Sequence, residues 1–164
     1  MTPGTARVTE HSYRIADEEG AIENAQRFAE IALSHCDKKS REAAAIAVLE
    51  LVNNLIKYAD GTGRESRTLR IQLDGEWLRI QSHNTVLSHE DGLAVVELVD
   101  KINSTPSICA LYRDRLRTLL TNPAVPRAQL GLLRIAYEGG FRLSCTYTAG
   151  SLEIEAERHL EAAR

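Results

Sequence analysis

The residues best suited to chemistry in this chain are a carboxylate and a carboxamide placed one helical turn apart. Glu50 and Asn54 belong to the stretch from Ala43 to Ala59, which contains no Pro or Gly and is rich in strong helix formers. On a helix, residues four apart share a face, so the two side chains point into one small volume. There an amide oxygen can ligate Mg²⁺ beside a phosphate, while a carboxylate polarises an attacking hydroxyl or water.

The helix that carries these residues is predicted over about 39–59, with Gly61 as its stop and Asp37 or Ser40 as its cap. Its polar residues form one narrow stripe, and Ala and branched aliphatic residues cover the rest. Such a helix is mostly buried, so its stripe must meet water, a polar network or a ligand. A solvated face is the simplest interpretation, but adjacent amides are unusual on one. The stripe consists of Glu50, Asn53, Asn54 and Lys57.

Composition limits the classes of function. The net charge of -3 and the absence of a basic run argue against nucleic acid and anionic membranes as partners. The three cysteines are far apart and the five histidines lack metal-ligand spacing, so we expect neither a disulfide framework nor a zinc site. No apolar run approaches the roughly 18 residues of a membrane span. We therefore expect a cytoplasmic protein without a membrane segment.

The remaining elements follow from periodicity and turn residues. The chain is predicted to fold as one domain over 1–164, with loose tails at about 1–6 and 158–164. Ser82 to Thr85 is interpreted as a polar corner, and the charged residues from Arg158 as a frayed end. The predicted elements are a strand at Thr9 to Ile15, a helix after Asp17 to about Cys36, a hairpin of Thr68 to Leu73 and Glu76 to Gln81, helices at about 90–103, after Pro106 and at Gln129 to Tyr137, and a hairpin of Phe141 to Thr148 and Ser151 to Glu157.

This order of elements predicts an α+β fold, a two-layer α/β sandwich whose mostly antiparallel sheet carries helices on one face. The run from Glu50 to Ala59, with Asn54 and Tyr58, resembles the N-box of the GHKL ATPase superfamily, and the predicted order matches its ATP-binding domain. Ala21 to Ala59 is similar to the front half of anti-sigma-factor, or partner-switching, serine kinases. From Gln81 onward the chain resembles SiaB-type protein kinases, in Ser82-His83-Asn84, Val99 to Asn103 and Leu130 to Ala136.

The resemblance implies a site for Mg-ATP. Asn54 would hold Mg²⁺, Glu50 would orient or deprotonate the attacking hydroxyl, and Lys57 would contact phosphate. Asn84 would face adenine, and Leu130 with Gly131 would border the lid over the phosphates. It implies phosphorylation of a Ser or Thr on a small STAS-type antagonist protein.

Two family motifs are incomplete in this chain. The superfamily usually places Asp-x-Gly-x-Gly after the hairpin, whereas this chain has His83-Asn84-Thr85-Val86 without a glycine. Asn84 can accept the adenine hydrogen bond or be a simple turn residue, and Asp91-Gly92 is a rival position for the motif. The later Gly-x-Gly-Leu lacks one glycine, and Gly131 can serve either phosphate binding or close packing.

The incomplete motifs leave three functional hypotheses. The first is a regulatory kinase that binds Mg-ATP, and the second is a catalytically degenerate module that sequesters a partner without phosphoryl transfer. The third is an interaction domain whose Glu50 stripe is only solvated. Apolar surface on the helices at 90–120 adds the expectation of a homodimer.

Overall fold

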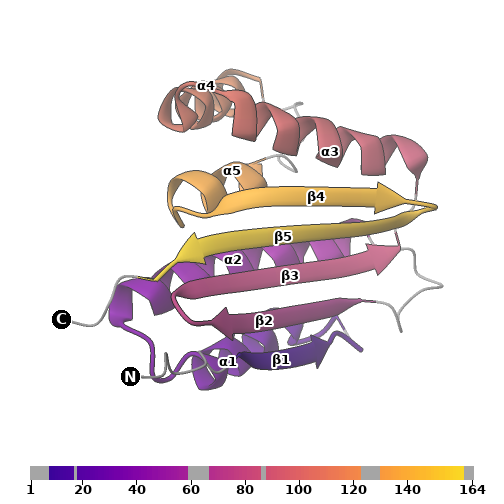
Figure 1. The fold of residues 1–164 in the computed structure, drawn as a ribbon. Helices are drawn as coiled ribbons and strands as arrows, with labels where there is room; N and C mark the ends of the chain where they lie inside the picture. Colours follow the sequence, from indigo (N-terminus) through magenta and orange to yellow (C-terminus); the bar gives the residue numbers. More distant parts are fainter. Residues whose placement is uncertain (1–7, 17, 59–66, 86–87, 123–129, 161–164) are drawn as a thin grey trace.

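The fold is a five-stranded antiparallel sheet with helices on one face, as seen in the computed structural model (Figure 1). The structure describes residues 8–16, 18–58, 67–85, 88–122 and 130–160. The predicted tail at 1–6 and the helix stop at Gly61 lie outside these ranges. The described elements are β1 (Thr9–Arg14), α1 (Ala21–Ala32), α2 (Lys38–Tyr58), β2 (Thr68–Asp74), β3 (Trp77–Thr85), α3 (His89–Ser104), α4 (Ile108–Thr121), α5 (Leu130–Tyr137), β4 (Arg142–Thr148) and β5 (Ser151–His159).

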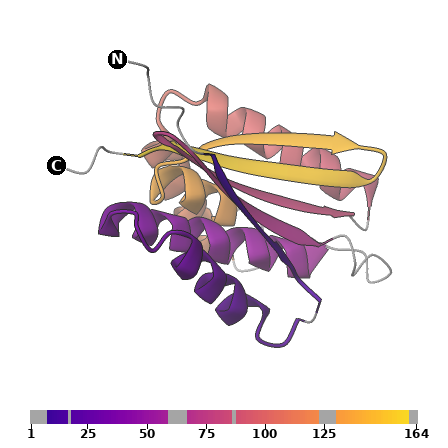
Figure 2. The same ribbon diagram turned by 60° about the horizontal axis from the view of Figure 1, so that its bottom comes forward.

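The strand order is β1-β2-β3-β5-β4, and every neighbouring pair is antiparallel. Helices α1, α2 and α5 lie behind the sheet, whereas α3 runs along its outer strand β4 (Figures 1 and 2). The predicted fold class, an α+β two-layer sandwich with a mostly antiparallel sheet, is confirmed. Its assignment to the GHKL superfamily stays a prediction.

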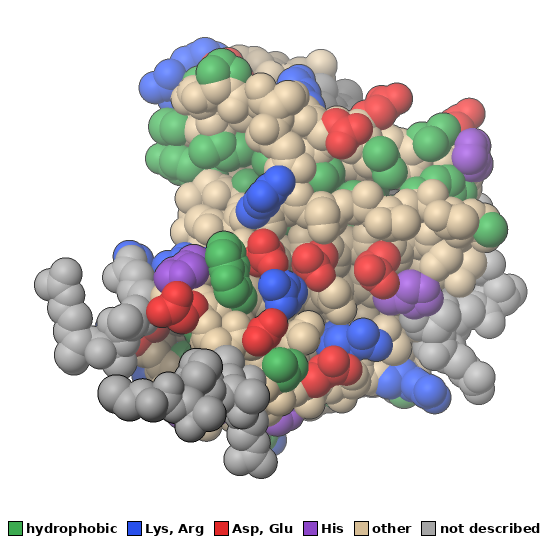
Figure 3. Space-filling view, viewed as in Figure 1, with side chains coloured by type: hydrophobic (Ala, Val, Ile, Leu, Met, Phe, Trp, Pro, Cys, Tyr) green, Lys and Arg blue, Asp and Glu red, His purple; other side chains and the backbone are tan. Residues whose placement is uncertain are grey.

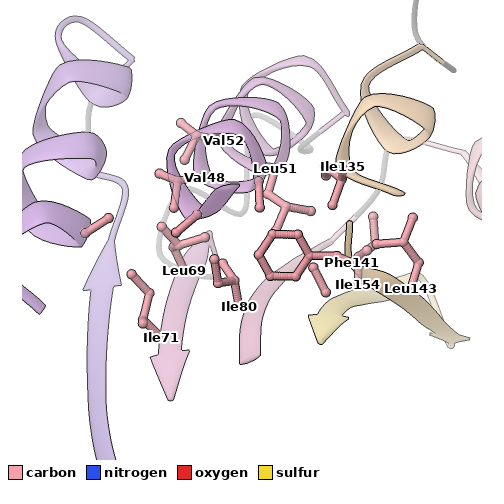
Figure 4. Close-up of a cluster of buried hydrophobic side chains, with 14 of the residues drawn as sticks. Val48, Leu51, Val52, Leu69, Ile71, Ile80, Ile135, Phe141, Leu143 and Ile154 are labelled. Carbon is pink, nitrogen blue, oxygen red and sulfur yellow. The ribbon is translucent and has the colours of Figure 1, made fainter. Parts of the chain in front are cut away.

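The core fills the space between the covered sheet face and helix α2 (Figure 4). Strand residues alternate strictly, so every second side chain of β2, β3 and β5 enters this layer. Helix α2 contributes residues that are completely buried, which agrees with its predicted apolar surface. The side chains labelled in Figure 4 are Val48, Leu51, Val52, Leu69, Ile71, Ile80, Ile135, Phe141, Leu143 and Ile154.

Capping side chains fix where three helices begin. Asp37 precedes α2 and accepts hydrogen bonds from the backbone N–H and the hydroxyl of Ser40, at 2.9 and 2.5 Å. Ser88 and Ser107 accept hydrogen bonds from backbone N–H groups in the first turns of α3 and α4. Of the two predicted caps of the central helix, Asp37 is therefore the one used.

Two predictions of local structure are wrong. Ser82 to Thr85 is not a corner, because it continues β3 and pairs with β5 along its whole length. The residues from Arg158 are not all frayed, because Arg158 and His159 extend β5 beside β3. In both places the hydrogen-bonded ladder of the sheet outweighs the polar character of the side chains, which the sequence pattern reads as loop.

No helix among the described residues covers the opposite face of the sheet, which carries polar side chains (Figures 1 and 3). Polar side chains pair across neighbouring strands there: Arg70 Nε of β2 lies 3.4 Å from Glu10 of β1, Arg79 Nε of β3 donates to Glu157 of β5 at 2.7 Å, and Gln81 of β3 donates to Glu155 of β5 at 2.5 Å. An antiparallel sheet with one solvated face needs this alternation of apolar and polar residues.

Candidate functional site

The stripe on α2 is not a uniformly solvated surface. Asn53 and Lys57 are exposed, whereas Asn54 is half-buried and the Glu50 side chain is only 14% exposed. The solvated-face interpretation therefore fits the outer two residues. Glu50 and Asn54, the pair with the predicted chemistry, lie at the inner edge of the stripe, where α2 meets the rest of the molecule.

Gly131, at the start of α5, lies directly against Glu50. A Cβ atom built on Gly131 would be 2.6 Å from Glu50 Oε2, which is closer than real Cβ atoms come, and 3.4 Å from Glu50 Cβ. Gly131 is buried, and Leu130 before it is half-buried. The structure thus brings together two segments that the sequence analysis had linked only through a resemblance. It also shows that Gly131 serves close packing, one of the two roles left open for it.

The Glu50 carboxylate is held by an arginine that the sequence analysis did not single out. Arg134 Nη1 donates a hydrogen bond of 2.5 Å to Glu50 Oε1, across 84 residues of sequence. Within the described part of the chain, Oε2 accepts no hydrogen bond and faces Gly131. The two oxygens therefore have different surroundings, one ion-paired and one beside the first turn of α5.

Arg134 is itself anchored by a second carboxylate. Its Nη2 donates to Glu138 Oε2 at 3.1 Å, and its Nε lies 3.3 Å from both oxygens of Glu138. Tyr112 on α4 donates to Glu138 Oε1 at 2.5 Å, so the network joins α2, α5 and α4. The hydrogen bond to Glu138 raises the pKa of Arg134, and the bonds from Arg134 and Tyr112 lower the pKa of Glu138.

Arg134 could have been noticed from local spacing alone. Glu138 directly follows the helix predicted for Gln129 to Tyr137 and is four residues after Arg134, a spacing at which opposite charges pair. Nothing in the sequence links Arg134 to Glu50, because that contact depends on how α5 packs against α2. Arg134 lies within the Leu130 to Ala136 segment that resembles the SiaB-type kinases.

Asn84, predicted to face adenine, is 4% exposed on the covered side of β3. Its amide nitrogen donates to the backbone oxygen of Thr85 at 3.2 Å. The carboxamide oxygen is the atom expected to accept from an adenine amino group. The turn interpretation of Asn84 is wrong, because the residue lies inside the strand.

Asp91-Gly92, the rival position for the Asp-x-Gly-x-Gly motif, has structural roles in this fold. Asp91 accepts a hydrogen bond from the Ser88 hydroxyl at 2.8 Å, and its backbone N–H donates to the same hydroxyl at 3.1 Å. A Cβ on Gly92 would be 2.5 Å from the Tyr147 ring. Asp91 therefore takes part in the cap of α3, and Gly92 lets this helix pack closely against β4.

His83, which precedes Asn84 in the chain, faces away from it. Successive strand residues point to opposite faces, so the imidazole lies on the open face of the sheet, with Nε2 at 2.7 Å from the Ser151 hydroxyl. There it borders a hollow of about 270 Å³ that is separate from the Glu50 region. The hollow is lined by Thr68, Arg70, Gln81, His83 and Glu153.

The residues around Asn54 suit a magnesium ion bound together with a phosphate. In the described part of the chain the Asn54 carboxamide makes no hydrogen bond, so its oxygen has no competing partner there. Mg²⁺ commonly takes one or two protein oxygens and completes its octahedron with phosphate and water. One amide oxygen beside a carboxylate is therefore a sufficient donor set for Mg-ATP, and too small for Mg²⁺ alone.

Comparison with known proteins gives no further assignment, since no family model and no curated protein matches this sequence. Among the described residues, no three His, Cys, Asp or Glu side chains gather in a way that could hold a metal ion. Over the same residues, no helix combines the length and apolar character that crossing a membrane requires.

Proposed function

We propose that this protein is a cytoplasmic regulatory kinase of the GHKL type, which binds Mg-ATP and phosphorylates a Ser or Thr of a small STAS-type antagonist protein. The proposal rests on the resemblance of α2 and α5 to the family motifs. One observation supports it: Gly131, at the start of α5, lies against Glu50, and Asn54 follows Glu50 by one helical turn on α2.

In the proposed reaction Glu50 acts on the attacking hydroxyl. Its oxygen Oε2, the one not held by Arg134, takes the proton while the hydroxyl oxygen forms a bond to the γ-phosphorus. The bond from that phosphorus to the bridging oxygen breaks, and ADP leaves with the electron pair. Without a partner protein, water can take the place of the hydroxyl. Phosphoryl transfer depends mainly on positioning and charge neutralisation, so few protein groups are needed.

The other residues bind and orient the nucleotide in this proposal. Asn54 would hold Mg²⁺, which neutralises phosphate charge when bound, and Lys57 at the exposed end of the stripe would contact phosphate. Asn84 would accept a hydrogen bond from adenine. Leu130 and Gly131 begin α5, whose first N–H groups suit an anion.

Calorimetry with Mg-ATP tests this proposal, with neighbouring amides as a matched pair of variants. We expect wild-type protein and Asn53→Ala to bind Mg-ATP and Asn54→Ala to lose most of the affinity, because only Asn54 lies at the inner edge of the stripe. Absence of binding to the wild type at millimolar nucleotide would refute nucleotide recognition. Phosphate on a purified STAS-domain protein, detected by mass spectrometry, would then test the transfer.

A second candidate function is sequestration of a partner without catalysis. The observation that favours it is the ion pair between Arg134 and Glu50, which occupies one oxygen of the proposed base. The glycines missing from the two family motifs also favour sequestration without catalysis. Capture of a STAS-domain protein that does not depend on ATP and leaves no phosphate on it would favour this function over the kinase.

The surface proposed for partners and for a homodimer is the outer side of α3 and α4. None of the residues of α4 is buried, Leu120 is 83% exposed and Leu93 on α3 is 43% exposed. Large apolar side chains exposed on surface helices are one feature of contact surfaces. Sedimentation of the wild type and a Leu93→Ser, Leu120→Ser variant would test the homodimer.

A further inference from the structure

We infer that Arg134 is a positioning residue, which fixes the Glu50 carboxylate so that Oε2 is the oxygen presented for proton transfer. The inference rests on the proposed function and names a residue that the family resemblance does not assign. Its basis is the unequal environment of the two oxygens of Glu50.

Arg134 determines which oxygen of Glu50 is available. Its Nη1 binds Oε1 at 2.5 Å, and Oε2 lies toward the backbone of Gly131. A carboxylate on a flexible glutamate side chain rotates freely unless one oxygen is held. The ion pair therefore removes this freedom and directs the second oxygen along the first turn of α5, where the phosphate would lie.

The same arginine is held independently of Glu50. Nε and Nη2 both face Glu138, and Glu138 also accepts from Tyr112 on α4. The Arg134 side chain is 31% exposed, so it stands at the boundary between core and solvent. Because its planar fork is fixed on one side by Glu138, it presents Nη1 to Glu50 in a single orientation.

The charges of this network are compatible with a base. Arg134 carries one positive charge between two carboxylates, Glu50 and Glu138, so the three groups together retain one negative charge. Arg134 thus orients Glu50 without cancelling the charge of the whole cluster. A lysine at 134 would keep the positive charge and lose the planar guanidinium, so it separates the contribution of the charge from that of the geometry.

The test measures ADP production from Mg-ATP, with water as the acceptor, and Mg-ATP affinity by calorimetry. We expect Arg134→Met to lower kcat by about tenfold or more, as loss of a group that orients a reactive side chain does. The dissociation constant for Mg-ATP should change less than about twofold, and Arg134→Lys should recover part of kcat. Arg117→Met, an exposed arginine on α4, is the matched control and should resemble the wild type.

A double-mutant comparison separates positioning from a merely structural role. If Arg134 acts through Glu50, Glu50→Gln and Glu50→Gln/Arg134→Met will have the same kcat. Rates are normalised to folded protein by circular dichroism, and the lysine variant decides the case if the methionine variant does not fold. An unchanged kcat in both Arg134 variants, or a further full loss in the double variant, overturns the inference. A wild type that neither binds nor turns over Mg-ATP overturns the proposed function instead and the inference with it.

Discussion

Gly131 approaches Glu50 so closely that a Cβ atom at residue 131 would lie 2.6 Å from Glu50 Oε2. The absent side chain lets the first turn of α5 lie directly on the carboxylate. Because Arg134 holds the other oxygen one turn further along α5, this helix both restricts and orients Glu50.

Gly131→Ala tests the consequence of this close approach. The new methyl group should displace the Glu50 carboxylate from Arg134, while alanine improves helix propensity by about 1 kcal/mol. Since the lost hydrogen bond to a charged group is worth about 1.5–3 kcal/mol, we expect a net loss of unfolding free energy of roughly 0.5–2 kcal/mol. Urea unfolding measures this free energy. The rate of ADP production should also fall, and an unchanged rate would show that the reaction does not depend on the position of Glu50.

Glu138 should make stability depend on pH at the acidic end. Its pKa is lowered in the folded protein by hydrogen bonds from Arg134 and Tyr112. The unfolded chain then binds more protons than the native state, so the contribution is full above the unfolded pKa of about 4.3 and is lost as pH falls through the folded pKa. The side chain is one-third exposed, so we expect roughly 0.5–1 kcal/mol.

The measurement compares urea unfolding of wild type and Glu138→Gln between about pH 6 and pH 3. The difference between the two proteins should shrink as pH decreases. Tyr112→Phe removes one of the two donors and should show a smaller pH-dependent difference. A gap between wild type and the Gln variant that stays constant over this range would contradict the assignment.

Gly92 should be required for the packing of α3 against β4. A Cβ there would be 2.5 Å from the Tyr147 ring, so Gly92→Ala forces the ring aside and disturbs its hydrogen bond to His89. Overpacking of this kind costs about 1–3 kcal/mol. We expect Gly92→Ala/Tyr147→Leu to recover part of that loss, and equal effects of Gly92→Ala in both backgrounds would exclude the clash as the cause.

Mutation of Glu18 to Ala should reduce the stability of the fold more than mutation of Arg67 to Met. The Arg67 side chain is 2% exposed and donates to Glu18 Oε1 at 3.1 Å, whereas Glu18 is 57% exposed. Glu18→Ala leaves a buried guanidinium without its carboxylate, which we expect to cost about 1–2 kcal/mol after allowance for screening at the exposed partner. Arg67→Met removes the charge and keeps apolar volume, so it should cost less. Thermal unfolding measures the loss of stability in both variants, and a larger loss in Arg67→Met than in Glu18→Ala would contradict this reasoning.

Local pattern predicted most elements of this fold correctly. The central helix, predicted over about 39–59, is α2 at Lys38–Tyr58, and the second hairpin turns at Ala149-Gly150 as predicted. The first hairpin turns at Gly75-Glu76, one residue later than the predicted Asp74-Gly75, because Asp74 pairs with Trp77. These features depend on residues close in sequence, through helix propensity, capping and turn conformation. The ends of β3 and β5 were predicted too short, because their polar residues are stabilised by pairing with each other across the sheet.

The sequence alone determined that Glu50 and Asn54 share one face of a helix, since that follows from the helical period. Only the tertiary structure decided what this face meets: Gly131 against Oε2, Arg134 on Oε1, and Glu138 with Tyr112 behind the arginine. Such contacts join residues far apart in the chain. They depend on how α5 packs against α2 and α4, and no local pattern of residues encodes that packing.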